Sequence, residues 1–276
     1  MTTATISPLV ALVDVTKRFP GKAALALDRV SATIPSGQFV AVIGRSGAGK
    51  TTLLRSLTGA TTISAGYVLV GGVELGGLRG DTLRAHHARV GMIYQQFNLV
   101  RRLRVLDNVL IGRLPHLTGW RRVAATVRMF DAAERERALR CLDHVGLLDR
   151  VWQRADTLSG GEQQRVAIAR LLAQDARVVL ADEPVASLDL ANGRLVMETL
   201  RRIARGAGLT VVATLHHVDY ARRYADRVIA LKEGRLVFDG PPDALSDAAL
   251  FEIFGVVPGE LPDDAAPAPR AALAAS

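Results

Sequence analysis

The sequence predicts an α/β fold with a mainly parallel central sheet, an antiparallel β part near the N-terminus and an inserted α-helical subdomain. Three features of the 276 residues support this fold class. A glycine-rich loop at residues 44–52 stands between an apolar strand and a helical segment, strands and helices alternate again from residue 177 onwards, and residues 95–156 show a helical pattern. Because alternating strands and helices connect by right-handed crossovers, the central strands are expected to run parallel, with helices covering both faces.

The first segments have the pattern of strands. Residues 9–15 alternate apolar and polar side chains, as a half-exposed strand does, and residues 16–21 have the composition of a turn. A second strand is expected at about residues 27–34, and a Pro-Ser-Gly run ends it before the next, apolar strand. Phe19 is the only aromatic residue about two dozen positions ahead of the glycine-rich loop, where a ring can stack on a nucleotide base. We therefore predict that Phe19 contacts a base, with simple packing as the alternative.

The glycine-rich loop reads G-R-S-G-A-G-K-T-T and matches the pattern G-x-x-x-x-G-K-[ST] without a mismatch. Glycines in such a turn let backbone N–H groups converge on an anion, and the start of the following helix adds partial positive charge. A glycine turn with an incidental lysine is the alternative, but the strand-to-helix setting favours a phosphate-binding loop and hence a P-loop nucleotide hydrolase fold. Lys50 is expected to hold the β- and γ-phosphates, and Thr51 is expected to hold Mg²⁺. The residues predicted to contact the nucleotide here are Gly44, Ser46, Gly47, Gly49, Lys50, Thr51 and Thr52.

The middle of the chain changes from strands to helices. Residues 66–73 and 90–93 are expected to be strands, separated by a short polar helix that contains His86 and His87. Adjacent residues project to different sides of a helix, so the two histidines are expected to be exposed to solvent and not to share a metal. Residues 133–148 carry apolar side chains at helical spacing with polar ones between them, which predicts an amphipathic helix.

Residues 178–183 form an apolar strand that ends in two acids, Asp182 and Glu183. In a protein with a phosphate-binding loop, the first acid can hold Mg²⁺ directly or through water, and the second can accept a proton from the water that attacks the γ-phosphate. Asp182 is therefore predicted as a metal ligand and Glu183 as the general base, with an ordinary charged strand end as the alternative. The other elements expected in this half are helices at about 191–204 and 220–225 and strands at about 209–215, 227–231 and 236–239.

Composition and charge limit the class of protein. A net charge of +8 suits a nucleic-acid-binding or membrane-surface protein, but the arginines are scattered and few aromatic residues lie among them, so a solvated basic surface is the default. No apolar run approaches the ~20 residues of a membrane span, and the N-terminus lacks a signal-peptide pattern, so a cytosolic protein is expected. The single cysteine, Cys141, is expected to be a buried small side chain and not a reactive thiol. Residues 258–276 are rich in Pro and Ala and are expected to be a disordered tail.

The octet at residues 158–165, L-S-G-G-E-Q-Q-R, places a serine hydroxyl and two glycine amides at the start of a helix, which makes a second cradle for an anion. With this octet the chain resembles the nucleotide-binding subunits of ABC transporters over about residues 9–257, as a single ATP-binding domain. The resemblance implies ATP with Mg²⁺, and it implies that Ser159, Gly160 and Gly161 contact ATP held by the phosphate loop of another subunit. It also implies a RecA-like core at about 9–94 and 165–240 and a helical subdomain at about 95–164.

The same resemblance assigns further residues. Gln95 falls where the family has a catalytic glutamine that binds Mg²⁺ and water and links the helical subdomain to the core; the adjacent Gln96 is the alternative. Asp189 matches a loop that contacts the second subunit across a dimer. His216 matches a histidine that contacts the γ-phosphate, and the neighbouring His217 is expected at the surface. The resemblance thus implies a head-to-tail dimer that sandwiches two ATP molecules.

Three longer stretches resemble phosphonate-import ATPases: residues 95–114, residues 182–189 with Val185 where many importer subunits have threonine, and residues 214–221. The expected function is the ATP-hydrolysing subunit of a bacterial importer for phosphonate or related phosphorus oxyanions. An importer ATPase for another small solute and a soluble nucleic-acid-associated ABC ATPase are the alternatives. The implied partners are a second copy of the chain, transmembrane permease subunits and, indirectly, a periplasmic solute-binding protein, with no nucleic acid expected. The implied location is the cytoplasmic face of the inner membrane.

Overall fold

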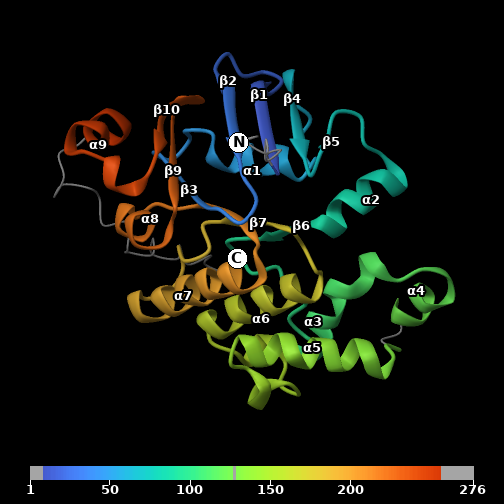
Figure 1. The fold of residues 1–276 in the computed structure, drawn as a ribbon. Coiled ribbons are helices and arrows are strands. Elements are labelled where there is room, and N and C mark those ends of the chain that lie inside the picture. Colours follow the sequence, from blue (N-terminus) through green and yellow to red (C-terminus); the bar gives the residue numbers. More distant parts are fainter. Residues whose placement is uncertain (1–8, 127–128, 256–276) are drawn as a thin grey trace, which may run out of the picture.

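The computed structural model describes residues 9–126 and 129–255 and builds them on two sheets (Figure 1). The central sheet has the strand order β10-β9-β3-β8-β7-β6. Its neighbours pair in parallel, except that β10 runs antiparallel to β9. Its strands are β3 (Phe39–Ile43), β6 (Val90–Ile93), β7 (Val178–Asp182), β8 (Thr210–Thr214), β9 (Arg227–Lys232) and β10 (Arg235–Gly240). The carboxyl ends of β3, β7 and β8 therefore meet at one edge of the sheet, which is where parallel α/β sheets bind ligands.

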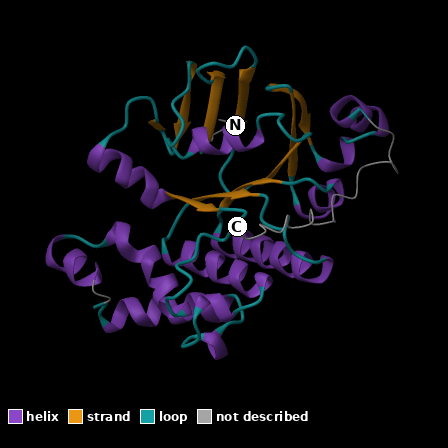
Figure 2. Cartoon of the chain, turned by 180° about the vertical axis from the view of Figure 1, so that it is seen from behind, coloured by secondary structure: helices purple, strands orange, loops and turns teal. Residues whose placement is uncertain are grey.

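The second sheet is antiparallel and has the order β2-β1-β4-β5. Its strands are β1 (Val10–Arg18), β2 (Leu25–Ile34), β4 (Ala65–Val70) and β5 (Val73–Glu74). Helix α1 contacts strands of both sheets and fills the space between them (Figure 2). The predicted fold class, a mainly parallel central sheet with an antiparallel N-terminal part and a helical insert, is confirmed.

Helices α3, α5, α6 and α7 lie on the face of the central sheet opposite to α1 and form the lower half of the molecule in Figure 1. Helices α3, α5 and α6 pack on one another, and α6 also contacts α7. The α-helices are α1 (Lys50–Leu57), α2 (Gly80–Arg89), α3 (Val105–Leu110), α4 (Gly119–Thr126), α5 (Ala132–His144), α6 (Gly160–Ala173), α7 (Leu190–Ala207), α8 (Val218–Tyr224) and α9 (Asp247–Phe254). Short 3₁₀ turns are η1 (Ile111–His116), η2 (Leu148–Arg150), η3 (Ala155–Thr157) and η4 (Pro242–Ala244). In the described parts of the chain, no helix combines the length and the apolar character that crossing a membrane requires.

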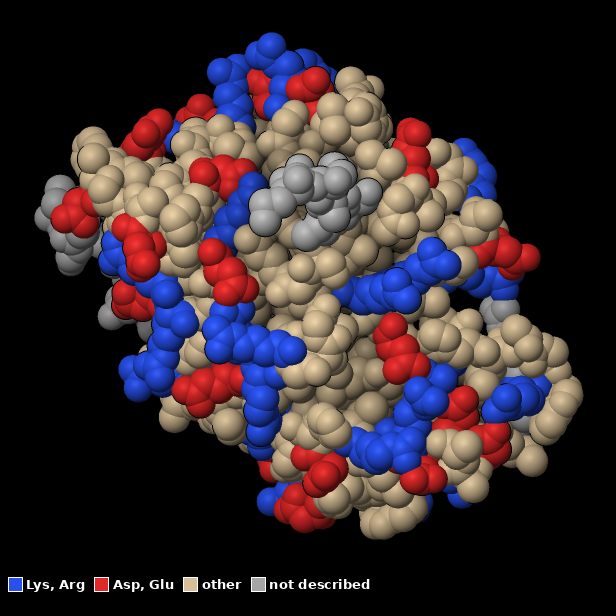
Figure 3. Space-filling model, viewed as in Figure 1, with Lys and Arg blue, Asp and Glu red and all other residues tan. Residues whose placement is uncertain are grey.

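The molecular surface mixes charges of both signs. Figure 3 shows Lys and Arg side chains interleaved with Asp and Glu over the visible face, and they do not form one basic field. Several arginines have carboxylate partners, including Arg227 with Asp239 at 2.5 Å and Arg235 with Asp28 at 2.7 Å. These pairs place a carboxylate beside each of these two arginines. On this face the positive charge is therefore dispersed, as the scattered arginines of the sequence predict.

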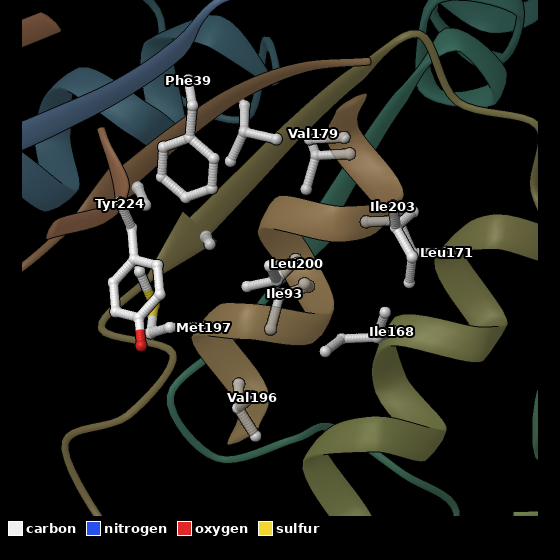
Figure 4. Packing of buried hydrophobic residues seen from close by; sticks show 14 of the residues in the cluster. Phe39, Ile93, Ile168, Leu171, Val179, Val196, Met197, Leu200, Ile203 and Tyr224 are labelled. Atoms are coloured by element: carbon white, nitrogen blue, oxygen red, sulfur yellow. The ribbon is translucent and has the colours of Figure 1, made fainter. Parts of the chain in front are cut away.

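Strand β3 divides the core into two parts. Phe39, Ala41 and Ile43 point into a cluster with α6 and α7, whereas Val40 and Val42 point into the cluster between the two sheets. This split follows from the alternation of side chains along a strand, and an entirely apolar run such as β3 fits because both faces of the sheet are covered. Figure 4 shows the first cluster, in which side chains from the sheet interdigitate with those of α6 and α7. Fully burying each large apolar side chain contributes about 1.5–3 kcal/mol.

Two expectations about α2 and α5 need correction. His86 is buried, with 5% of its surface exposed, and its Nε2 lies 3.0 Å from the carbonyl oxygen of Leu57. Helix α2 packs over the end of α1, whose last carbonyls lack helical partners, so the imidazole replaces water there; burial lowers the pKa of His86. His87 is exposed as expected. Helix α5 ends at His144, earlier than predicted, and the chain turns through a left-handed Gly146.

Two further expectations concern Cys141 and the C-terminal segment. Cys141 is half-buried, packs against the core, and has its pKa raised to about 11, chiefly by burial. A thiol with that pKa is almost entirely protonated at neutral pH, which disfavours reaction as a thiolate. The side chain is not fully buried, in contrast to the expectation. The segment expected to be a disordered tail, residues 258–276, lies outside the described residues.

Candidate nucleotide-binding and hydrolysis site

The phosphate loop connects β3 to α1, and two of its glycines leave no space for a side chain. Gly44 and Gly49 have φ of 144° and 106°. A Cβ atom on Gly44 would lie 2.2 Å from the carbonyl oxygen of Leu231, and one on Gly49 would lie 2.4 Å from that of Ala26. Both positions therefore need glycine for its backbone conformation and for space. The loop is pressed against β9 and β2, which fixes the direction of its N–H groups.

Lys50 begins α1 and curls back over the loop. Its Nζ donates to the carbonyl oxygens of Gly44 at 2.7 Å and Arg45 at 3.1 Å. The side chain is buried, and this burial lowers the pKa of Lys50, although the charges of Asp182 and Glu183 act in the opposite direction. An ammonium group held only by neutral carbonyls in a buried loop is suited to an incoming anion, because a phosphate supplies the charge that the carbonyls lack.

Asp182, at the end of β7, is held by two hydroxyl groups. Thr51 Oγ1 donates to its Oδ1 at 3.1 Å, and Thr214 Oγ1 donates to the same atom at 3.0 Å. Thr51 belongs to the phosphate loop and Thr214 ends the neighbouring strand β8. The carboxylate and the Thr51 hydroxyl thus present hard oxygen ligands side by side at the loop, a donor set that fits Mg²⁺.

Glu183 follows Asp182 in a strained backbone conformation, with φ of 51°. Its N–H donates to Thr214 Oγ1 at 2.8 Å, and its carboxylate accepts a hydrogen bond from His216 Nε2 at 2.5 Å. The hydrogen bond from His216 is the main reason that the pKa of Glu183 lies below its usual range, and the charge of Lys50 adds to it. Left-handed geometry at a non-glycine residue is typical of functional sites, where surrounding contacts hold it in place.

Two separate cavities are lined by part of the predicted site residues, whereas Gly44, Ser46, Asp182, Asp189 and the octet residues Ser159, Gly160 and Gly161 line neither of them. One, of about 200 Å³, is lined by Gln95, Glu183, Thr214 and His216 among others, and Gln96 is not among its lining residues. A second, of about 330 Å³, contains Phe19 together with Lys22 and the loop residues Gly47, Gly49, Lys50, Thr51 and Thr52. A larger cavity of about 800 Å³, between α5, α6 and α7, contains none of the predicted site residues.

Phe19 is half-buried beside the phosphate loop. The ammonium group of Lys17 lies 4.9 Å from the centre of its ring, so one face of the ring already has a cation near it. The ring is therefore placed where a nucleotide base can reach it, at the same cavity as the phosphate-binding lysine.

The octet serine lies elsewhere, at the start of α6. Ser159 Oγ accepts from the N–H of Glu162 at 3.3 Å, and the Glu162 carboxylate accepts from the N–H of Ser159 at 2.9 Å, which makes a capping box. A Cβ on Gly161 would lie 2.6 Å from Asn192 Oδ1, and Asp189 caps α7 by accepting from the N–H of Asn192 at 2.9 Å. The octet therefore packs against the segment that carries Asp189, and neither lines the cavity of the phosphate loop.

Thr214 is the residue whose role the sequence did not predict. It hydrogen-bonds to the side chain of Asp182 and to the backbone of Glu183 from the adjacent strand. The sequence contains the signal only in part: a threonine ends a buried strand, but nothing in the sequence says that this strand lies next to the one that ends in the two acids.

Comparisons with known proteins identify the family to which the chain is similar. A model of the ABC transporter family matches residues 27–186. The phosphonates import ATP-binding protein PhnC of Rhizobium etli is 49% identical over 244 residues, which cover 88% of this chain and 85% of the relative. The protein of the same name from Stutzerimonas stutzeri is 51% identical over 245 residues, covering 87% of each chain.

The fold also matches solved structures. A dimeric post-hydrolysis state of the ATP-binding cassette MJ0796 bound to ADP and Pi superposes with a TM-score of 0.73 at 33% identity, covering 84% of this chain and 98% of that one. The match with the family model over residues 27–186 and the identity to relatives over most of their length show the family of the chain. The chain belongs to the ABC transporter family, as one of its ATP-binding subunits.

Proposed function

We propose that this chain is the ATP-hydrolysing subunit of a bacterial importer that takes up phosphonate or related phosphorus oxyanions. The observation that carries the ATPase assignment is the joined set of Lys50, Thr51, Asp182, Glu183 and His216 at one edge of the central sheet. The cargo rests on relatives about half identical over most of their length that are named phosphonates import proteins. The fold unit proposed is one ATP-binding domain at 9–257, with a RecA-like core at about 9–94 and 165–240 and a helical subdomain at about 95–164.

In the proposed reaction, the loop amides and Lys50 hold the triphosphate, and Phe19 packs on the base. Thr51, Asp182 and Gln95 would hold Mg²⁺, which offsets the negative charge of the phosphates. Lys50 gives up its two carbonyl partners for phosphate oxygens, an exchange favoured because a neutral acceptor is replaced by a charged one.

Glu183 is proposed to accept the proton of the attacking water. Its lowered pKa keeps it ionised at neutral pH, as a base must be, but the carboxylate is engaged by His216. The base becomes available when His216 turns to a γ-phosphate oxygen, which is a stronger acceptor than a shared carboxylate. Binding of ATP and release of the base are then one event, which is how a switch histidine would link occupancy to hydrolysis.

A second copy of the chain is proposed to complete the site. Ser159, Gly160 and Gly161 stand at a helix start outside the phosphate-loop cavity, which supports a role toward the nucleotide of another subunit. Asp189 lies beside the octet and is proposed to contact the second copy. The further partners are transmembrane permease subunits and, indirectly, a periplasmic solute-binding protein, which puts the chain at the cytoplasmic face of the inner membrane.

The ATPase assignment is tested with Glu183→Gln, which keeps the size of the side chain and removes the base. The turnover of ATP should fall about 10²- to 10⁴-fold, and size-exclusion chromatography with Mg-ATP should show a trapped dimer. Glu136→Gln, on the exposed face of α5, is the matched control and should behave as the wild type. A Glu183→Gln protein that stays monomeric and hydrolyses ATP at the normal rate would show that another group is the base.

The cargo is tested by growth. Cells that lack this chain and any redundant importer should fail to grow on a phosphonate as sole phosphorus source and should grow normally on inorganic phosphate. The wild-type chain should restore growth and Lys50→Ala should not. Undiminished growth and uptake without the chain would reject phosphonate as the cargo and favour another small solute.

A further inference from the structure

The turn that follows Gln95 has a strained backbone. Phe97 and Asn98 are consecutive non-glycine residues with φ of 54° and 47°. Phe97 N–H donates to the carbonyl of Tyr94 at 3.1 Å, and Asn98 N–H donates to that of Gln96 at 2.5 Å, which closes a three-residue turn around Phe97. A three-residue turn with positive φ at its centre is rare and unfavourable in isolation. Contacts from outside the turn must therefore hold it.

Arg170, on the third turn of α6, supplies those contacts. Its guanidinium donates to the carbonyl oxygen of Asn98 at 2.7 Å and to that of Phe97 at 3.3 Å. The residue is half-buried, and in the described part of the chain its side chain has no carboxylate partner. Removing a guanidinium from water without a counter-ion is unfavourable, and the two charge-assisted hydrogen bonds to the turn offset that penalty.

The same turn also touches the beginning of α6. A Cβ atom on Gly160 would lie 3.8 Å from the end of the Phe97 ring and 3.2 Å from the side chain of Leu188. Gly160 and Arg170 are ten residues apart, roughly 15 Å along a helix. The turn therefore lies against α6 at two places. The Phe97 ring lies near Gly160 at the start of the helix, and the Arg170 guanidinium binds the carbonyl groups of the turn further along it.

We propose that Arg170 is a positioning residue for ATP hydrolysis, which ties the turn carrying Gln95 to α6 so that Gln95 and the octet at the start of α6 move as one unit. The proposal rests on the proposed function of the chain. Gln95 lines the cavity that contains Glu183 and His216. Ser159 is the N-cap of α6, the helix to which Arg170 connects the turn. A displacement of Gln95 by nucleotide in one subunit is then passed directly to the helix whose start faces the nucleotide of the second subunit.

The test is a double-mutant cycle in the full chain. Arg170→Met removes all donors and keeps an apolar stem. Arg170→Lys keeps the charge on a single donor nitrogen, and Gln95→Ala removes the side chain that is positioned. Arg170→Met should lower kcat for ATP about tenfold or more, Arg170→Lys should restore part of it, and ATP affinity should change less than about twofold, because Arg170 does not line the phosphate-loop cavity. In the Gln95→Ala background, Arg170→Met should cause little further loss.

A second readout reports the turn itself. In Arg170→Met, but not in Arg170→Lys, the amides of Phe97 and Asn98 should exchange with deuterium faster, while those of β7 and β8 keep their protection. Arg140→Met, on the exposed face of α5, is the control and should change neither exchange nor kcat. Losses of kcat that multiply in the double variant, or faster exchange spread along all of α6, would overturn the positioning role. A wild-type chain without ATPase activity would instead refute the proposed function.

Discussion

Removal of the Thr214 hydroxyl tests whether β8 holds the two strand-end acids in place. Thr214 is fully buried, accepts from the N–H of Glu183 at 2.8 Å and donates to Asp182 at 3.0 Å. Thr214→Val keeps the shape of the side chain, so no cavity contributes. An amide left without a partner costs about 1–3 kcal/mol, and a hydrogen bond to a carboxylate contributes about 1.5–3 kcal/mol. Since Asp182 keeps its bond from Thr51, we expect a loss of about 2–4 kcal/mol in the free energy of unfolding.

Urea unfolding and ATPase kinetics measure the two consequences. The midpoint of unfolding should fall at unchanged slope. The turnover of ATP should fall about tenfold to hundredfold, less than on removal of the base, because Glu183 keeps its carboxylate but loses the bond that holds its left-handed backbone. Thr214→Ser retains the hydroxyl and is the matched control. If the valine variant unfolds within about 0.5 kcal/mol of the serine variant and turns over ATP as fast, the hydroxyl does not position the acids.

Three further predictions follow from single contacts. Gly44→Ala should prevent ATP binding and destabilise the chain by about 2 kcal/mol or more, because its Cβ would lie 2.2 Å from a backbone carbonyl oxygen of β9. Gly47→Ala has open space at its Cβ and should lose about 1 kcal/mol from backbone strain alone. Equal losses of unfolding free energy in urea would contradict this expectation. The pKa of Glu183 is lowered by His216, so this pair stabilises the fold at pH values above the ordinary glutamate pKa of about 4.3, and the contribution is lost as the pH falls through the lowered pKa. The difference in unfolding free energy between wild type and Glu183→Gln should therefore be larger at pH 7 than at low pH. A difference that does not change with pH would speak against the pair. Cys141, with a pKa of about 11, should react with a thiol reagent at pH 7.5 more than about a hundredfold slower in the folded chain than in the unfolded one, and comparable rates would show that the thiol is accessible and ionised.

The parts of the site whose placement in the fold the sequence predicts are those whose signals are local. The phosphate loop is one continuous run, and its glycines, lysine and threonine stay together because a single strand-to-helix turn carries them. The acids at 182 and 183 could be assigned because a buried strand ends there. Contacts between distant segments were not predictable: the role of Thr214 depends on β8 lying next to β7, and the burial of His86 depends on α2 covering the end of α1. The role of Arg170 was not predictable either, because its partners Phe97 and Asn98 lie far from it in the sequence.

Contacts within one chain also explain why hydrolysis should depend on assembly. In the single subunit, the carboxylate of Glu183 is satisfied by His216, and the hydroxyl of Ser159 donates to its own neighbour, Glu162, at 2.9 Å. Both groups that the proposed reaction needs are therefore already occupied by internal partners. A γ-phosphate is the common competitor, because it attracts His216 from one subunit and the Ser159 hydroxyl from the other. In the proposed dimer, this exchange of two internal contacts for one shared phosphate would require both subunits at once. We therefore expect that a permease that controls how closely the two copies approach would also control when ATP is consumed.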